Sequence, residues 1–308
     1  MGKIAFLFSG QGAQYPGMGK DLYDNISCVK ELFDMAEDIR PGTRIQCFES
    51  DEETLKKTEN TQPCMFLTDY ACAKALNSYG IYADAAAGFS LGEVVAITYS
   101  GILDDRSGFE LVKRRAELMG ECNIKYPGTM CAVLRADADL LEELCSECGV
   151  YAVNYNCPGQ TSVAGNLDKM EAFYAKLEEH KIRCVKLAVS GSFHTPYMKD
   201  ASEGLSDMLN TLSVNAPKLP VYANYTAGCY PDKADEICEL ISMQVSHSVK
   251  WEETIRNMYD TGVDTFIECG PGQTLSGLVR KTLKGVNIYN VNDMESLKAT
   301  CEKLGVTI

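Results

Sequence analysis

Residues 88–92, Gly-Phe-Ser-Leu-Gly, constrain the fold more than any other part of this sequence. They follow a run of mainly small residues at 83–87 that predicts a buried strand, and residues 93–97 are typical of a helix. A Gly-x-Ser-x-Gly turn between a strand and a helix is the setting of a nucleophile elbow. A side chain at either glycine would collide with the neighbouring strand or helix, so only the serine projects. The sequence therefore predicts an α/β fold with an exposed serine at a strand–helix turn.

Ser90 has two interpretations. Its oxygen is expected at a helix N-terminus, where free N–H groups and the helix dipole favour a developing negative charge. The alternative is a serine that only caps the helix in an ordinary turn. The combination of the motif with a preceding strand and a following helix favours the nucleophile.

Composition sets the class of protein. The 308 residues are 45% hydrophobic and 23% charged, which is typical of a globular protein large enough for one large domain and a smaller one. The formal charge of −14 argues against nucleic acid as a partner. No apolar run is long enough for a membrane span and the N-terminus lacks a signal-peptide core, so we expect a cytoplasmic protein without membrane contact.

The 14 cysteines are scattered through strand-like and helix-like segments. One Cys-x-x-Cys pair, Cys145 and Cys148, lies in an acidic helical stretch, and neither a second pair nor spaced histidines accompany it. Metal sites need such a second set of ligands. We therefore expect reduced cysteines that pack as small hydrophobic residues, and no metal.

Apart from its central segment, the chain alternates strands and helices. Strands are predicted at 3–8, 83–87, 221–224 and 263–268, and helical patterns at 20–80, 104–119, after 234 and at 275–283. Such alternation with a nucleophile elbow predicts an α/β-hydrolase-like core around a parallel sheet. We assign residues 1–125 and 191–308 to this large catalytic domain.

The central segment has a different order of elements. Strands are predicted at 130–134, 150–153, 161–164 and 183–189, with helices at 137–148 and 167–180. The order β-α-β-β-α-β is the ferredoxin-like signature. We therefore expect residues 126–190 to form a small ferredoxin-like subdomain inserted into the large α/β domain.

A nucleophilic serine needs a base, and histidine has the most suitable pKa. The chain has three histidines. His180 ends a solvated helix, and His247 lies in a segment that is either structural or close to the site. His194 lies in a loop that leaves a buried strand where the large domain resumes, and catalytic groups concentrate in such loops. His194 is the favoured base.

Arg115 gives an independent signal. On a helix over 111–122, it falls in the middle of an apolar stripe, whereas Arg114 falls on the opposite face with acidic neighbours. A buried guanidinium needs an anion. One interpretation is a structural ion pair with a buried carboxylate such as Glu268. The other is a substrate carboxylate held by the bidentate guanidinium.

Gln11 lies between two glycines just after the first predicted strand. From there its backbone N–H could reach an oxyanion, next to the N–H of Leu91 that follows the serine. A phosphate-binding loop is not predicted here, because the pattern Gly-x-x-x-x-Gly-Lys is missing.

With these motifs, the chain resembles the malonyl-CoA:acyl-carrier-protein transacylases of bacterial fatty-acid synthesis, nearly end to end. The motifs that carry the resemblance are Gly-Phe-Ser-Leu-Gly-Glu at 88–93, Phe-Ser-Gly-Gln-Gly at 8–12, Thr-Gln-Pro at 61–63, Asn-x-Asn-x-Pro-Gly-Gln at 154–160 and Glu-x-Gly-Pro-Gly at 268–272. Ser9 stands where the family usually has proline.

The resemblance implies a role for each of several residues. Ser90 would be the nucleophile and His194 its base, oriented by a backbone carbonyl from 247–251 rather than by an aspartate. The N–H groups of Gln11 and Leu91 would form the oxyanion hole, and Arg115 would bind the malonyl carboxylate. The resemblance also places three further residues in the substrate pocket: Phe193, Gln62 and Gln160. Phe193 would leave little room for a branched acyl group.

The implied reaction is the transfer of malonyl from malonyl-CoA to acyl carrier protein through a malonyl-serine ester, without a cofactor, for fatty-acid or polyketide elongation. An acidic carrier protein requires a local basic surface on this acidic chain. The candidates are Lys186, Lys250, Arg280, Lys281 and Lys284. The alternative function is a serine acyl-thioesterase or esterase with the same elbow, which would usually carry Ser…Asp…His in chain order.

Overall fold

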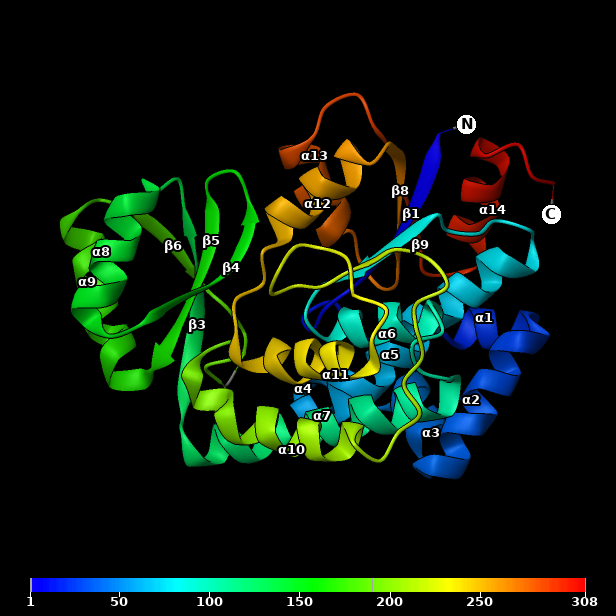
Figure 1. The fold of residues 1–308 in the computed structure, drawn as a ribbon, viewed down its shortest axis with the longest axis horizontal. Coiled ribbons are helices and arrows are strands. Elements are labelled where there is room, and N and C mark those ends of the chain that lie inside the picture. The colour runs from blue at the N-terminus through cyan, green and yellow to red at the C-terminus, as the bar shows by residue number, and fades with distance from the viewer. Residues whose placement is uncertain (1, 190, 308) are drawn as a thin grey trace.

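The computed structural model describes residues 2–189 and 191–307. Its larger sheet is parallel, with the strand order β7-β2-β1-β8-β9. The bounds of its strands are β1 Lys3–Phe8, β2 Ala85–Gly88, β7 Val221–Tyr222, β8 Val263–Cys269 and β9 Asn287–Val291. Figure 1 labels three of these strands, β1, β8 and β9. Side chains alternate along β1, so that Phe6 and Phe8 face one core, whereas Ala5 and Leu7 face the other.

Helices cover both faces of this sheet, which gives three layers. One core packs Phe6 and Phe8 against α5, α6 and α7, and the other packs Leu7 against α12 and α13. The helices of the larger part are α1 Lys20–Asn25, α2 Ser27–Ile39, α3 Thr43–Glu49, α4 Glu52–Lys56, α5 Thr58–Ser78, α6 Leu91–Tyr99, α7 Asp105–Lys125, α10 Lys199–Leu209, α11 Ala234–Met243, α12 Trp251–Asp260, α13 Thr274–Thr282 and α14 Met294–Lys303, with 3-10 turns at Pro196–Met198 and Gln244–Ser246.

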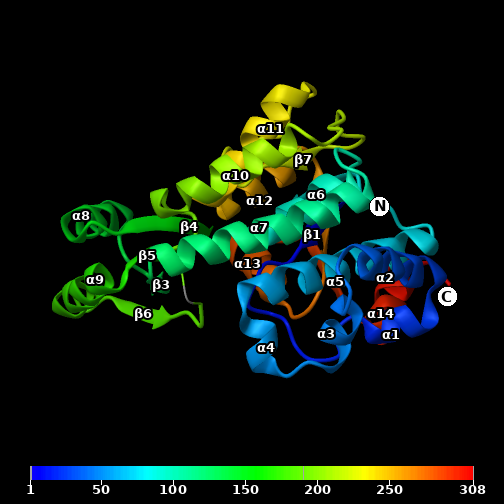
Figure 2. The ribbon, with the colours of Figure 1, turned by 90° about the horizontal axis from the view of Figure 1, so that it is seen from below.

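The smaller sheet is antiparallel, with the order β4-β5-β3-β6, and α8 and α9 pack on one of its faces. Its elements are β3 Gly128–Leu134, α8 Ala138–Cys148, β4 Tyr151–Cys157, β5 Gln160–Asn166, α9 Leu167–Glu179 and β6 Arg183–Lys186. This sheet lies at one end of the molecule and the two chain termini lie at the other (Figure 2). The predicted α/β class and the predicted order of elements in this segment are confirmed.

Strand ends in the small sheet differ from the prediction. The central hairpin is tighter than expected, because Cys157 pairs with Gln160 and only two residues remain in the turn. Gly159 has φ 72°, the conformation that such a turn requires. The last strand ends at Lys186 rather than at 189. The division of the chain at 126–190 stays a prediction, and residue 190 lies outside the described residues.

The two sheets are joined by more than the chain crossovers. The segment after the second 3-10 turn runs beside β4, where Tyr155 N–H donates to the Val249 carbonyl at 2.9 Å and Val249 N–H donates to the Val153 carbonyl at 2.7 Å. This backbone pairing fixes the small sheet against the carboxyl edge of the large one. Among the described helices, none combines the length and apolar character needed to cross a bilayer.

Candidate active site

Ser90 lies in the turn between β2 and α6. Its backbone has φ 55° and ψ −106°, a conformation that non-glycine residues rarely adopt and that is common at functional sites. A Cβ on Gly88 would lie 1.9 Å from the Gly92 carbonyl, and one on Gly92 would lie 2.2 Å from the Phe8 carbonyl oxygen. The close approach of α6 to β1 and β2 therefore requires both glycines, as the sequence predicts.

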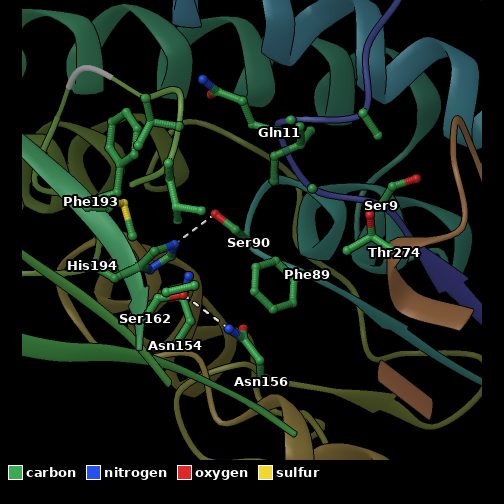
Figure 3. A pocket seen from close by; sticks show the side chains of 18 of the residues that line it. Ser9, Gln11, Phe89, Ser90, Asn154, Asn156, Ser162, Phe193, His194 and Thr274 are labelled. Atoms are coloured by element: carbon green, nitrogen blue, oxygen red, sulfur yellow. Dashed lines mark hydrogen bonds between the residues drawn. The ribbon is translucent and has the colours of Figure 1, made fainter. Parts of the chain in front are cut away.

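The structure brings His194 to Ser90. The Ser90 Oγ and His194 Nε2 are 2.8 Å apart (Figure 3), and the ring is nearly buried. On the other side, His194 Nδ1 lies 3.0 Å from the Gln244 carbonyl and 3.1 Å from the His247 carbonyl. Carbonyls only accept, so Nδ1 carries the proton and Nε2 is free to accept the Ser90 proton. His247 lies in the predicted stretch 247–251, whereas Gln244 lies outside it.

Burial lowers the pKa of His194 to about 4, and the positive charge of Arg115 acts in the same direction. The imidazole is therefore neutral at physiological pH and can act as a base. The other two histidines are placed differently. His180 is exposed at the end of α9. The ring of His247 packs against Tyr225 at an angle of 46°, and its Nδ1 donates to the Met243 carbonyl at 2.8 Å.

Arg115 is 2% exposed and reaches the nucleophile from α7. Its Nη2 donates to Ser90 Oγ at 3.2 Å and to Gln244 Oε1 at 2.9 Å, and its Nη1 donates to Gln62 Oε1 at 2.5 Å. These partners are neutral, so the guanidinium still presents a positive charge beside Ser90. Burial lowers the pKa of Arg115 to about 10, and the group remains cationic at neutral pH.

The structural alternative for Arg115 was an ion pair with Glu268, and the contacts of that carboxylate are different. Its two oxygens accept the N–H groups of Leu275 and Ser276 at 3.0 and 2.8 Å, at the start of α13. A carboxylate is stabilised there by free N–H groups and the helix dipole. Glu268 therefore anchors α13 to the sheet and does not form an ion pair with Arg115.

The cavity above Ser90 has a volume of about 300 Å³. Gln11 and Leu91 both line it, and Leu91 is the first residue of α6, where the helix supplies no acceptor for its N–H. Gln62, Gln160 and Phe193 also line it, as the resemblance implies. The side chains of Asn154, Asn156 and Ser162 face Ser90 from the small sheet (Figure 3). The cavity therefore lies between the two sheets.

Two amides that the sequence reasoning missed hold the Ser90 turn. Asn224 Oδ1 accepts the Ser90 N–H at 2.7 Å, and Asn224 Nδ2 donates to the Gly88 carbonyl at 2.6 Å. Gln244 Nε2 donates to the Ser90 carbonyl at 2.6 Å. Asn224 ends a predicted strand at the carboxyl edge of the sheet, which is the signal that could have found it. Gln244 begins the second 3-10 turn, and no sequence motif marks that position.

The described residues contain no group of three or more His, Cys, Asp or Glu side chains that could hold a metal ion. The contacts around Ser90 suit covalent acyl chemistry. Ser90 is hydrogen-bonded to a neutral histidine, and the positive charge of Arg115 lies beside it in a cavity that Gln11 and Leu91 also line. Fold and site thus define an acyltransferase type of centre, and the acyl transferase domain family matches the chain over residues 5–300.

Comparison with known proteins narrows this class. The malonyl CoA-acyl carrier protein transacylase of Bacillus subtilis is 36% identical over 99% of this chain and 98% of its own length. The crystal structure of the transacylase of the same name from Clostridium perfringens superposes with a TM-score of 0.93 and 38% identity, over 98% of this chain and 97% of that one. The chain therefore belongs to the malonyl CoA-acyl carrier protein transacylase family.

A third relative was solved with a partner. It is a malonyl-transacylase in complex with a type II PKS acyl-carrier protein, with a TM-score of 0.93 and 30% identity over 98% of this chain and 99% of that one.

Proposed function

We propose that this protein transfers the malonyl group of malonyl-CoA to the phosphopantetheine thiol of acyl carrier protein through an ester on Ser90. The observation that carries the choice of acyl group is the buried guanidinium of Arg115, 3.2 Å from the nucleophile. An acyl chain that carries a carboxylate can pair with this charge on the substrate side, whereas a plain acetyl group cannot.

In the first half-reaction, the Ser90 hydroxyl gives its proton to His194 Nε2 while Oγ bonds to the thioester carbon. The N–H groups of Gln11 and Leu91 stabilise the negative oxygen of the tetrahedral intermediate. The carbon–sulfur bond then breaks, and His194 returns the proton to the sulfur of coenzyme A. The product is free coenzyme A and a malonyl ester on Ser90.

The second half-reaction repeats these steps with the other thiol. The phosphopantetheine thiol gives its proton to His194, and its sulfur attacks the ester carbon. When the carbon–oxygen bond breaks, Ser90 Oγ takes the proton back from His194. Arg115 keeps the malonyl carboxylate in place during both half-reactions, which fixes the position of the carbonyl relative to Ser90.

We propose a role in carrier docking for five basic residues, Lys186, Lys250, Arg280, Lys281 and Lys284. The support for this assignment is the position of Lys281, whose Nζ donates to Gln160 Oε1 at 3.1 Å, at a residue that lines the cavity. Complementary charge would attract an acidic carrier protein to the side of the cavity where Lys281 lies.

The thioesterase alternative would need an acidic side chain behind His194. Two backbone carbonyls accept from His194 Nδ1 instead. A carbonyl orients the ring without adding a negative charge, which favours transfer through a dyad over a Ser–Asp–His triad.

The test is the intact mass of the protein after mixing with malonyl-CoA, with acetyl-CoA as the comparison. We expect a malonyl adduct on the wild-type chain, no adduct on Ser90→Ala, and loss of the adduct when carrier protein is added. Hydrolysis of malonyl-CoA as the main reaction in the presence of carrier protein would overturn the proposal.

A further inference from the structure

Glu93 is a buried carboxylate that the mechanism above does not use. It lies on α6 three residues after the nucleophile and is 3% exposed. One oxygen accepts the Tyr230 hydroxyl, and the other accepts the Asn224 N–H at 3.1 Å. A buried carboxylate with two hydrogen bonds still needs a positive charge in its surroundings.

Arg115 supplies a positive charge that acts on Glu93 without a direct ion pair being formed. Glu93 and Arg115 both line a small cavity of about 10 Å³ behind the active site, which Gln244 and Tyr230 also line. The apolar residues that line the same cavity are Val94, Ile97, Leu111, Leu205 and Ile241. Among the described residues, the Nε–H of Arg115 has no hydrogen-bond acceptor, while Nη1 donates to Gln62 and Nη2 donates to Ser90 on the substrate side, and Nη2 also donates to Gln244 at the rear cavity. The guanidinium thus lies between the substrate cavity and Glu93.

We propose that Glu93 is a positioning residue that balances the charge of Arg115 from behind the site and thereby adjusts how strongly Arg115 selects a carboxylate-bearing acyl group. The inference rests on the proposed malonyl transfer. Two anions then share one buried cation, Glu93 when it is ionised and the malonyl carboxylate when it binds. Each weakens the attraction of Arg115 for the other.

The protonation of Glu93 makes this competition measurable. Burial raises the pKa of Glu93 to about 7, against the opposing effects of its hydrogen bonds and of Arg115. The titratable groups that face it are Arg115 from α7 and Tyr230, with His194 beyond Arg115. Burial raises the pKa of Tyr230 far above neutral, and those of Arg115 and His194 are about 10 and about 4. Between pH 6 and 8, Glu93 is therefore the group of this set that changes charge.

The sign follows from the charges. Below pH 7 Glu93 is neutral and Arg115 attracts the malonyl carboxylate fully, whereas above pH 7 the ionised Glu93 competes. The ratio of kcat/KM for malonyl-CoA to kcat/KM for acetyl-CoA should therefore fall as the pH rises from 6 to 8. Both substrates carry coenzyme A, so its phosphates cancel in the ratio. If the bound malonyl carboxylate raises the pKa of Glu93 by about half a unit, the ratio should fall about threefold between pH 6 and 8.

The experiment measures this ratio from pH 6 to 8 for the wild type and three variants. In Glu93→Gln we expect a ratio that does not change with pH. In Tyr230→Phe, the loss of a hydrogen bond that stabilises the ionised carboxylate should raise the pKa of Glu93, so the fall should move to higher pH. Glu117→Gln removes the same charge from the outer face of α7, where Glu117 pairs with Arg114, and should behave as the wild type.

The outcomes separate the two proposals. A wild type that forms no malonyl ester would overturn the proposed function itself. Malonyl transfer with a ratio that is independent of pH, or with the same pH dependence in Glu93→Gln, would overturn the role of Glu93 alone. If Glu93→Gln does not fold, Tyr230→Phe decides, since an unmoved midpoint contradicts the proposal. A purely structural role would lower both kcat/KM values together and leave the ratio unchanged.

Discussion

Removing the amide of Asn224 should lower both the free energy of unfolding and the acylation rate, because this amide bridges two backbone groups of the nucleophile turn. Asn224→Ala leaves the Ser90 N–H and the Gly88 carbonyl without the partners that lie at 2.7 and 2.6 Å. Each buried group that loses its partner costs about 1–3 kcal/mol, so the expected loss of unfolding free energy is about 2–6 kcal/mol. The backbone N–H that binds Glu93 remains.

The rate of Ser90 acylation should fall as well. Ser90 is held at φ 55°, and without the bridge its backbone can relax away from this strained conformation. A displacement of about 1 Å at a reacting group costs on the order of 100-fold in rate. We therefore expect Asn224→Ala to acylate Ser90 on the order of 100 times more slowly than the wild type.

The assays are urea unfolding and the rate of the malonyl adduct by rapid-quench mass spectrometry. Asn257→Ala is the matched control, because Asn257 Nδ2 donates one bond of 3.0 Å to the Ala227 carbonyl, outside the set of residues that line the cavity. It should lose about 1 kcal/mol and keep the wild-type acylation rate. If Asn224→Ala matched this control in both measurements, the reasoning about the turn would be refuted.

The remaining predictions concern three charged or titratable groups. Arg115→Ala should reduce kcat/KM for malonyl-CoA by at least 100-fold while acetyl transfer is kept or increased, and an equal loss of both would contradict the assigned role. With acetyl-CoA as substrate, the acylation rate should be constant from pH 8 to about 5 and fall tenfold per unit below about 4, because protonated His194 cannot accept the serine proton; a fall that begins near 6.5 would show that burial does not lower this pKa. Lys281→Glu should slow transfer to carrier protein several-fold and leave transfer to free pantetheine unchanged, with Lys303→Glu on α14 as the control; equal slowing of both transfers would exclude docking.

The sequence was most informative where one local rule decides the structure. The strand–turn–helix around Ser90 was predictable because only glycine fits at 88 and 92. The inward direction of Arg115 was predictable because helical periodicity places it among apolar neighbours. The elements of the small sheet followed from the order of strand-like and helix-like stretches in residues 126–190.

The remaining parts depend on contacts that the sequence does not show. Gln244 and Asn224 meet Ser90 across 154 and 134 residues of chain, and neither periodicity nor a motif relates them. The two carbonyls that hold His194 belong to the backbone, where side-chain identity carries little information. The possible ion pair between Arg115 and Glu268 could not be excluded from charge alone, because the start of α13 offers a carboxylate an equally good environment.

The backbone pairing between β4 and Val249 has a mechanical consequence. The same short segment supplies the carbonyls of Gln244 and His247 that orient His194. The wall of the substrate cavity that β4 forms and the backbone segment that orients His194 are therefore rigidly connected. A substitution that tilts the small sheet to admit a larger acyl group would also rotate the imidazole away from Ser90. Changes of acyl size in this protein should therefore be sought on α7 and at Phe193, and not in β4.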